Sequence, residues 1–131
     1  MRRIKNMIKE IINTTEAPAA VGPYVQAVKA GGMIYCSGQL GINPETGELG
    51  ADIEAQTKQS MENLGIVLKE AGSDYNKIVK TTIFLADMKD FAVVNEIYKN
   101  YFTGAYPARS CVQIAMLPKN GLVEIECITA E

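Results

Sequence analysis

The sequence predicts a single α+β domain in which a mixed β-sheet carries two helices on one face. Three observations support this fold. The chain has 131 residues, 47% of them hydrophobic, which is enough for one compact core. Short β-prone runs alternate with two segments of helical periodicity. No repeat, low-complexity tract or linker divides the sequence, so one domain is expected over residues 1–131.

The first third of the chain predicts three strands. The β-prone runs cover residues 8–13, 25–30 and 33–37. Gly22-Pro23 marks a turn before the second run, and Gly31-Gly32 permits the positive φ angles of a tight hairpin between the second and third. Residues 1–6 are interpreted as an additional tail, and Met7 is an alternative start.

The first predicted helix runs from a cap at Asp52 to about Ala71, where Gly72 stops it. The residues of one face recur three or four positions apart: Ile53, Thr57, Met61, Leu64 and Leu68. A buried strand over residues 78–86 follows, rich in β-branched side chains.

The second predicted helix begins after Asp87 or Asp90 and ends before Gly104. One face of this helix is formed by Phe91, Val94, Tyr98 and Tyr101. The last two strands are expected at residues 110–116 and 123–129, on either side of a turn at 118–121. Two helices on one face leave the other sheet face uncovered, which is most simply buried against identical subunits.

Composition excludes several classes of function. The net charge is -2 and there is no basic surplus to bind nucleic acid. The absence of histidine removes the commonest general base and the commonest zinc ligand. Cys36, Cys111 and Cys127 are odd in number and lie in apolar runs, which is typical of a reduced cytoplasmic protein. No window approaches the ~20 apolar residues of a membrane span.

Arg109 is the first candidate functional residue, because the other two arginines lie in the tail. A rigid guanidinium fork at the start of a strand suits a carboxylate ligand. The alternative is a surface arginine in a structural ion pair. Cys111, on the same side of the strand, could be a nucleophile whose thiolate depends on Arg109 or on a helix terminus. The alternative is a small buried apolar residue with only its backbone near a ligand.

Glu124 and Glu126 share one face of the final strand. They form either the solvated side of a sheet or, if partly desolvated, a group that positions and deprotonates water. Tyr24 follows a Gly-Pro turn and could stack on or hydrogen-bond a planar ligand; the alternative is a tyrosine that only packs against the turn. Ser37-Gly38 ends a strand where glycine permits close backbone approach.

The segments GPYVQAV, YCSGQLGINPETGE, KTTIFLADMKDF and YPARSCVQIAMLPKNGLVEIE together resemble the RidA/YjgF family of reactive-intermediate deaminases. The resemblance runs from about Ile8 to Glu131. It implies a chorismate-mutase-like α+β fold and a homotrimer with clefts at the subunit interfaces. It also implies hydrolysis of 2-imino acids, such as 2-iminobutanoate and 2-iminopropanoate, to 2-oxo acids and ammonia. No cofactor is implied, because an imine carbon is already electrophilic.

The resemblance also assigns roles to residues. The family's site maps onto Tyr24, Ser37, Gly38, Phe91, Asn95, Arg109, Cys111 and Glu124. Arg109 would bind the substrate carboxylate, and Glu124 would hold the attacking water. The substrates would come from enamines released by pyridoxal-phosphate dehydratases.

Two rival functions share these residues. A regulatory protein could bind small carboxylates in the same cleft without turnover. Chorismate mutase activity is suggested by fold analogy alone. Chorismate carries two carboxylates, and the sequence offers only one arginine outside the tail to bind them.

A hairpin at 118–121 would separate Arg109 from Glu124 by roughly 20 Å along the strands. We therefore expect the two residues to meet across a subunit interface.

Overall fold

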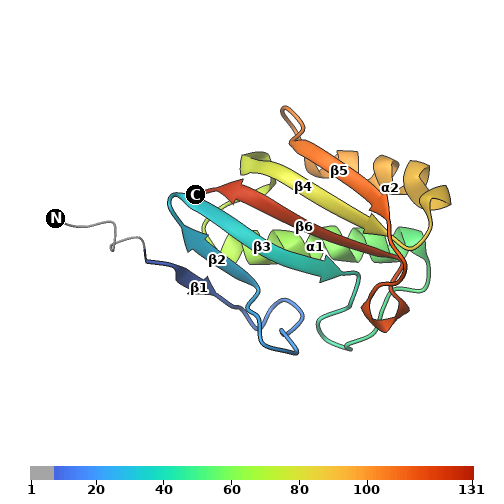
Figure 1. Ribbon diagram of the computed structural model, residues 1–131, viewed down its shortest axis with the longest axis horizontal. Helices are drawn as coiled ribbons and strands as arrows, with labels where there is room; N and C mark the ends of the chain where they lie inside the picture. Colours follow the sequence, from blue (N-terminus) through green and yellow to red (C-terminus); the bar gives the residue numbers. More distant parts are fainter. Residues whose placement is uncertain (1–7) are drawn as a thin grey trace.

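A computed structural model describes residues 8–131, so the expected tail and the alternative start at Met7 lie outside the described residues. Residues 8–131 form a six-stranded sheet of order β1-β2-β3-β6-β4-β5 (Figure 1). The strands are β1 (Glu10–Ile12), β2 (Ala27–Ala30), β3 (Met33–Leu40), β4 (Ile78–Leu85), β5 (Ala108–Gln113) and β6 (Val123–Ala130). Neighbouring strands are antiparallel except β4 and β5, which are parallel. The predicted α+β class is confirmed.

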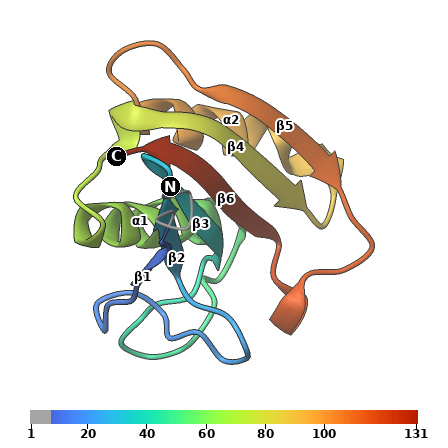
Figure 2. The same cartoon turned by 60° about the vertical axis from the view of Figure 1, so that its left-hand side comes forward.

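Both helices cover the same face of the sheet, as predicted. α1 (Ile53–Glu70) packs on β3 and β6, and α2 (Phe91–Tyr98) packs beside α1. Figures 1 and 2 show the two helices behind the sheet. The core between the two layers consists of fully buried side chains, among them Ile34, Met61, Leu64, Ile83 and Ile125.

The turn and cap residues behave as the sequence predicts. Gly31 and Gly32 have φ angles of 59° and 80° and close the β2–β3 hairpin. The Asp52 side chain accepts a hydrogen bond from the Ala55 N–H at 2.9 Å and so caps α1. Gly72, with a φ of 83°, ends that helix in the left-handed region.

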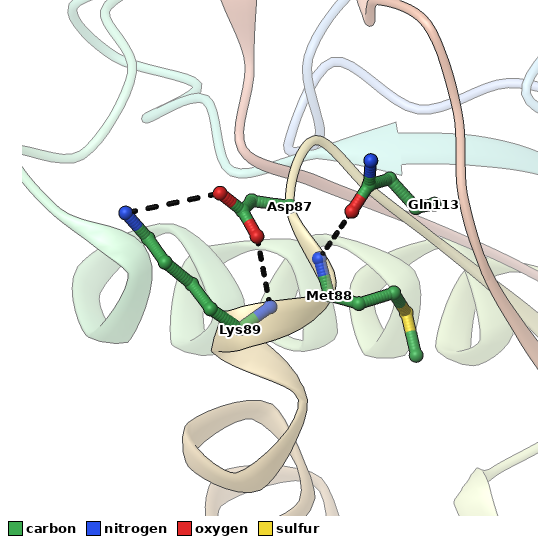
Figure 3. Close-up of polar contacts among 4 residues, drawn as sticks. All are labelled: Asp87, Met88, Lys89 and Gln113. Carbon is green, nitrogen blue, oxygen red and sulfur yellow. Dashed lines mark hydrogen bonds and ion pairs between the residues drawn. The ribbon is translucent and has the colours of Figure 1, made fainter.

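The second helical region is divided into three parts, rather than forming the single helix expected. Short 3-10 turns flank α2: η3 (Met88–Asp90) and η4 (Lys99–Tyr101). Asp87 caps η3 by accepting a hydrogen bond from the Lys89 N–H at 2.9 Å. Gln113, at the end of β5, accepts a second one from the Met88 N–H at 2.7 Å (Figure 3). The start of the α2 region is thereby fixed to the end of β5.

The expected hairpin between the last two strands is wrong. β4 lies between β5 and β6, and β5 runs parallel to β4 after the crossover through α2. Residues 118–120 form a further 3-10 turn, η5 (Pro118–Asn120), instead of a hairpin loop. β5 begins at Ala108, two residues before the expected start, so Arg109 lies inside the strand.

The uncovered face of the sheet carries exposed apolar side chains. Ile11, Tyr35 and Val112 on this face are 55%, 47% and 43% exposed. Each alternates along its strand with residues directed toward the helices. Across residues 8–131, neither helix has the length and apolar character needed to cross a membrane.

Candidate functional site

Arg109 lies on the helix-covered side of β5 and is held by α2. Its Nη1 donates a hydrogen bond to Asn95 Oδ1 at 2.7 Å. The guanidinium carbon lies 5.5 Å from the centre of the Phe91 ring and 5.2 Å from that of Tyr98. Both distances suit cation–π attraction. One amide and two aromatic rings therefore form the Arg109 seat, defined as Phe91, Asn95 and Tyr98.

The Arg109 seat contains no acidic group. Within the part of the chain that the structure describes, the ion pairs join Lys89 to Asp87 and Lys99 to Glu96. Arg109 forms no ion pair with another side chain of residues 8–131, so the alternative of a structural ion pair within this part of the chain is wrong. A guanidinium has five N–H donors, so donors remain for an anionic ligand. A cavity of about 360 Å³, whose lining includes Asn95, Tyr98 and Arg109, adjoins the guanidinium.

Cys111 lies two residues after Arg109 on the same side of β5, as predicted, and packs partly against the core. Burial raises the pKa of its thiol, and the Arg109 charge opposes this shift only in part. A nucleophilic cysteine needs a thiolate. The arrangement therefore favours the small apolar role over the nucleophile.

Glu124 projects from the uncovered face of β6. Its neighbours Val123 and Ile125 are fully buried beneath the helices, while Glu124 is half-buried. Burial raises the pKa of the Glu124 carboxyl group above its usual 4.5, and the charge of Glu126 on the same face raises it further. A carboxyl group with a raised pKa is a stronger base than an ordinary one, which favours a role in proton transfer.

Gly38 provides the space that the Glu124 side chain occupies. It lies in an irregularity of the β3–β6 pairing between Cys36 and Gln39. A Cβ atom at Gly38 would lie 2.8 Å from Glu124 Cδ. A side chain at position 38 would therefore displace the carboxylate of Glu124 from its place beside β3.

A second cavity, of about 480 Å³, lies in front of Glu124 and Gly38, and Tyr24 also lines it. Ser37 does not appear in its lining; its hydroxyl donates to the Val25 carbonyl at 2.7 Å. Ser37 therefore anchors the loop that carries Tyr24. The Gln26 side chain secures the same region by donating to the Pro18 carbonyl at 2.9 Å.

The eight expected site residues thus fall into two groups on opposite faces of the sheet. Tyr24, Gly38 and Glu124 line one cavity, with Ser37 behind it, while Phe91, Asn95, Arg109 and Cys111 lie around β5 and α2. Arg109 is in register with Thr81, and Thr81 with Cys127, three residues from Glu124. The Cα atoms of Arg109 and Glu124 are therefore roughly 14 Å apart. Arg109 and Glu124 of one chain are therefore separated, as expected. The reason is not a hairpin: β4 lies between their strands, and their side chains lie on opposite faces of the sheet.

Sequence reasoning missed the contribution of Tyr98 to the Arg109 seat and assigned it only to the core face of a helix. Phe91, Asn95 and Tyr98 follow one another at spacings of four and three, which places them on one face of α2. That spacing was the available signal. No cluster of three metal-ligating side chains occurs in residues 8–131.

Comparison with known proteins places the chain in a family. The family model described as endoribonuclease L-PSP matches residues 14–131. The mouse protein named 2-iminobutanoate/2-iminopropanoate deaminase is 52% identical over 130 residues, covering 98% of this chain and 96% of its own. A crystal structure of a putative endoribonuclease L-PSP from Entamoeba histolytica has a TM-score of 0.92 at 50% identity, covering 95% of this chain and all of that one.

A second solved structure, E. coli TdcF with bound serine, has a TM-score of 0.90 at 45% identity and covers 93% of this chain and 98% of its own. These matches span the segments that carry the resemblance to RidA/YjgF proteins. The chain therefore belongs to the endoribonuclease L-PSP (RidA/YjgF) family.

Proposed function

We propose that the protein hydrolyses reactive 2-imino acids, such as 2-iminobutanoate and 2-iminopropanoate, to 2-oxo acids and ammonia. The observation that carries the proposal is Arg109, a partly buried guanidinium whose partners are an amide and two aromatic rings. A charge held by neutral groups is available for a ligand carboxylate. The name of the mouse relative and the serine bound to TdcF support a small substrate with a carboxylate.

In the proposed reaction Arg109 binds the carboxylate and the backbone at Gly38 and Cys111 fixes the plane of the substrate. Water adds to the imine carbon, and Glu124 accepts the proton that the water loses. Glu124 passes that proton to the nitrogen, which gives a carbinolamine. Glu124 then takes the proton of the new hydroxyl group and delivers it to the nitrogen as the carbon–nitrogen bond breaks, so that the 2-oxo acid forms and ammonia leaves. The imine carbon is already electrophilic, so the reaction requires no cofactor.

The raised pKa of Glu124 suits these proton transfers. A carboxyl group with an ordinary pKa is a weak base and returns protons poorly near neutral pH. Burial and the neighbouring Glu126 charge move the pKa of Glu124 upward, toward the working pH. Tyr24 and Phe91 then serve as walls, and Asn95 keeps Arg109 oriented.

We further propose that the site is completed between subunits of a homotrimer. Arg109 is on the edge strand β5, whereas Glu124 is on the inner strand β6 and faces the uncovered side of the sheet. Joining Arg109 of one copy to Glu124 of the next is a head-to-tail contact, which closes into a ring. The exposed apolar side chains Ile11, Tyr35 and Val112 would be covered in such an assembly.

The proposed setting is the cytoplasm, alongside pyridoxal-phosphate dehydratases. These enzymes release enamines that tautomerise to imines, the form the site would accept. Neither nucleic acid nor a membrane is needed as a partner.

A coupled assay tests the proposal. Threonine dehydratase supplies the imine, and semicarbazide traps the imine that is not hydrolysed. Semicarbazone formation is followed by absorbance. Wild type should suppress the semicarbazone, whereas Arg109→Ala should not. Lys77→Ala, which removes a cation outside both cavities, is the matched control. Equal suppression by wild type and Arg109→Ala would overturn the role of Arg109, and no suppression by wild type would overturn the activity.

The substitution Glu124→Gln distinguishes the proposed enzyme from the alternative, a carboxylate-binding protein without turnover. A binder needs Arg109 but no group to handle water. If the enzyme proposal is correct, Glu124→Gln abolishes turnover while the affinity for 2-oxobutanoate, measured by calorimetry, stays within about threefold. Turnover that survives this substitution would contradict the proposed role of Glu124.

A further inference from the structure

We propose that Tyr98, through its hydrogen bond to Thr81, is a positioning residue that holds Arg109 in the orientation needed to bind a carboxylate. The proposal rests on the proposed function for the identity of the substrate. It adds a buried pair of hydroxyl groups, remote from the reacting atoms, to the determinants of substrate affinity.

The two hydroxyl groups form a closed contact beneath Arg109. Tyr98 Oη and Thr81 Oγ1 are 2.7 Å apart. Tyr98 is 4% exposed and Thr81 is 0% exposed, so water does not compete for either group. Burial raises the pKa of Tyr98, which keeps the phenol neutral and able to donate. A bond between two desolvated hydroxyls strongly specifies where the ring lies.

Thr81 and Tyr98 reach Arg109 from two sides. Thr81 is the partner of Arg109 in the parallel β4–β5 register, so the two residues are neighbours on adjacent strands. Tyr98 comes from α2 and places its ring 5.2 Å from the guanidinium carbon. The ring of Phe102 packs against the ring of Tyr98, with 4.9 Å between the two ring centres. The position of the Tyr98 ring is therefore fixed relative to the strand from which Arg109 projects.

This arrangement matters because an arginine side chain has large conformational freedom. Its single hydrogen bond in the seat, to Asn95, constrains one nitrogen. The Tyr98 ring limits the tilt of the guanidinium plane, which sets the direction of the remaining donors. When the hydroxyl pair is broken, the ring gains freedom and Arg109 samples orientations that do not match the ligand.

The test separates orientation from folding. Tyr98→Phe keeps the ring and loses the hydroxyl, and Thr81→Val keeps the shape and loses the partner. Both are expected to raise KM for 2-iminobutanoate roughly 3- to 10-fold, with kcat within about twofold, because the carboxylate contact acts on substrate and transition state alike. A variant that is merely less folded has fewer active sites, which lowers kcat and leaves KM unchanged.

Tyr75→Phe is the matched control. The Tyr75 hydroxyl is part-buried and donates to the Met61 carbonyl at 2.7 Å, and the Tyr75 ring packs against Tyr101 and Phe102 rather than against the Arg109 seat. This variant should lower thermal stability and leave KM unchanged. The double variant Thr81→Val/Tyr98→Phe removes both polar groups, so it should regain stability relative to the single variants while KM stays raised.

Binding of 2-oxobutanoate, measured by calorimetry, gives a readout independent of turnover. Its Kd should rise by the same factor as KM in Tyr98→Phe and Thr81→Val. If wild type proves inactive but Kd rises in Tyr98→Phe and Thr81→Val and not in Tyr75→Phe, the proposed function fails and the positioning role stands. If both variants have wild-type KM and Kd, or if Tyr75→Phe shifts them equally, the positioning role is overturned.

Discussion

The close approach of the Glu124 side chain to Gly38 makes Gly38→Ala an informative substitution. The new Cβ would lie 2.8 Å from Glu124 Cδ, 2.9 Å from Cγ and 3.0 Å from Oε2. Ordinary van der Waals contact begins at 3.4 Å, so the Glu124 carboxylate must move until its distances to the new Cβ reach about that value. The atoms met belong to the end of a flexible side chain, which can move without displacing the backbone. The fold should therefore tolerate alanine, at a cost below about 1.5 kcal/mol.

The activity should be affected far more than the stability. A misplacement of about 1 Å in a catalytic group can cost 10²-fold in rate, so a shift of a few tenths of an ångström or more predicts a loss of roughly 10- to 100-fold in kcat. That loss corresponds to about 1.4 to 2.7 kcal/mol of transition-state stabilisation. The semicarbazide-coupled assay measures the rate, and urea unfolding measures the stability.

Gly104→Ala is the matched control, because a Cβ there meets no atom within 4 Å. It should leave both rate and stability close to those of wild type. Wild-type turnover by Gly38→Ala, with normal folding, would refute the assignment of Glu124 as the group that positions water.

The remaining predictions concern Glu124 and Gln113. The acid limb of the kcat/KM profile should lie above pH 4.5, and Glu126→Gln should move it to lower pH by removing a charge that raises the pKa of Glu124. Because the folded state binds this proton more tightly than the unfolded chain, its stabilising contribution is present below pH 4.5 and is lost as the pH rises through the folded pKa. Urea unfolding across this range should therefore show a flatter profile for Glu124→Gln. Gln113→Ala, which removes the acceptor for the Met88 N–H, should lower stability by about 1 kcal/mol, and Gln113→Glu should restore it. Equal losses in the two Gln113 variants would contradict that bond.

The elements fixed by local chemistry could be predicted from the sequence. Gly31 and Gly32 are residues that the tight turn requires, and Asp52 and Gly72 are the signals that begin and end α1. These interactions span a few residues, so they leave a readable pattern. The helix-covered and uncovered faces of β6 also follow from simple alternation.

Strand order could not be predicted in the same way. The last two strands are joined by a short connection, which favours a hairpin when only local spacing is considered. The structure instead inserts β4 between β5 and β6, because α2 carries the chain across to the edge of the sheet. The role of Tyr98 could not be predicted for a similar reason. Its spacing in the helix already explains it as a core residue, and its proximity to Arg109 depends on the strand order.

The opposite facing of Arg109 and Glu124 has a genetic consequence under the proposed assembly. Each site would take its arginine from one chain and its glutamate from the next, so no chain alone would own a complete site. A cell that produces Arg109→Ala and Glu124→Gln chains in equal amounts would form mixed rings. About a quarter of the interfaces in such rings would combine an intact arginine with an intact glutamate. Two individually inactive alleles would then complement each other, as they could not if each chain enclosed its own site.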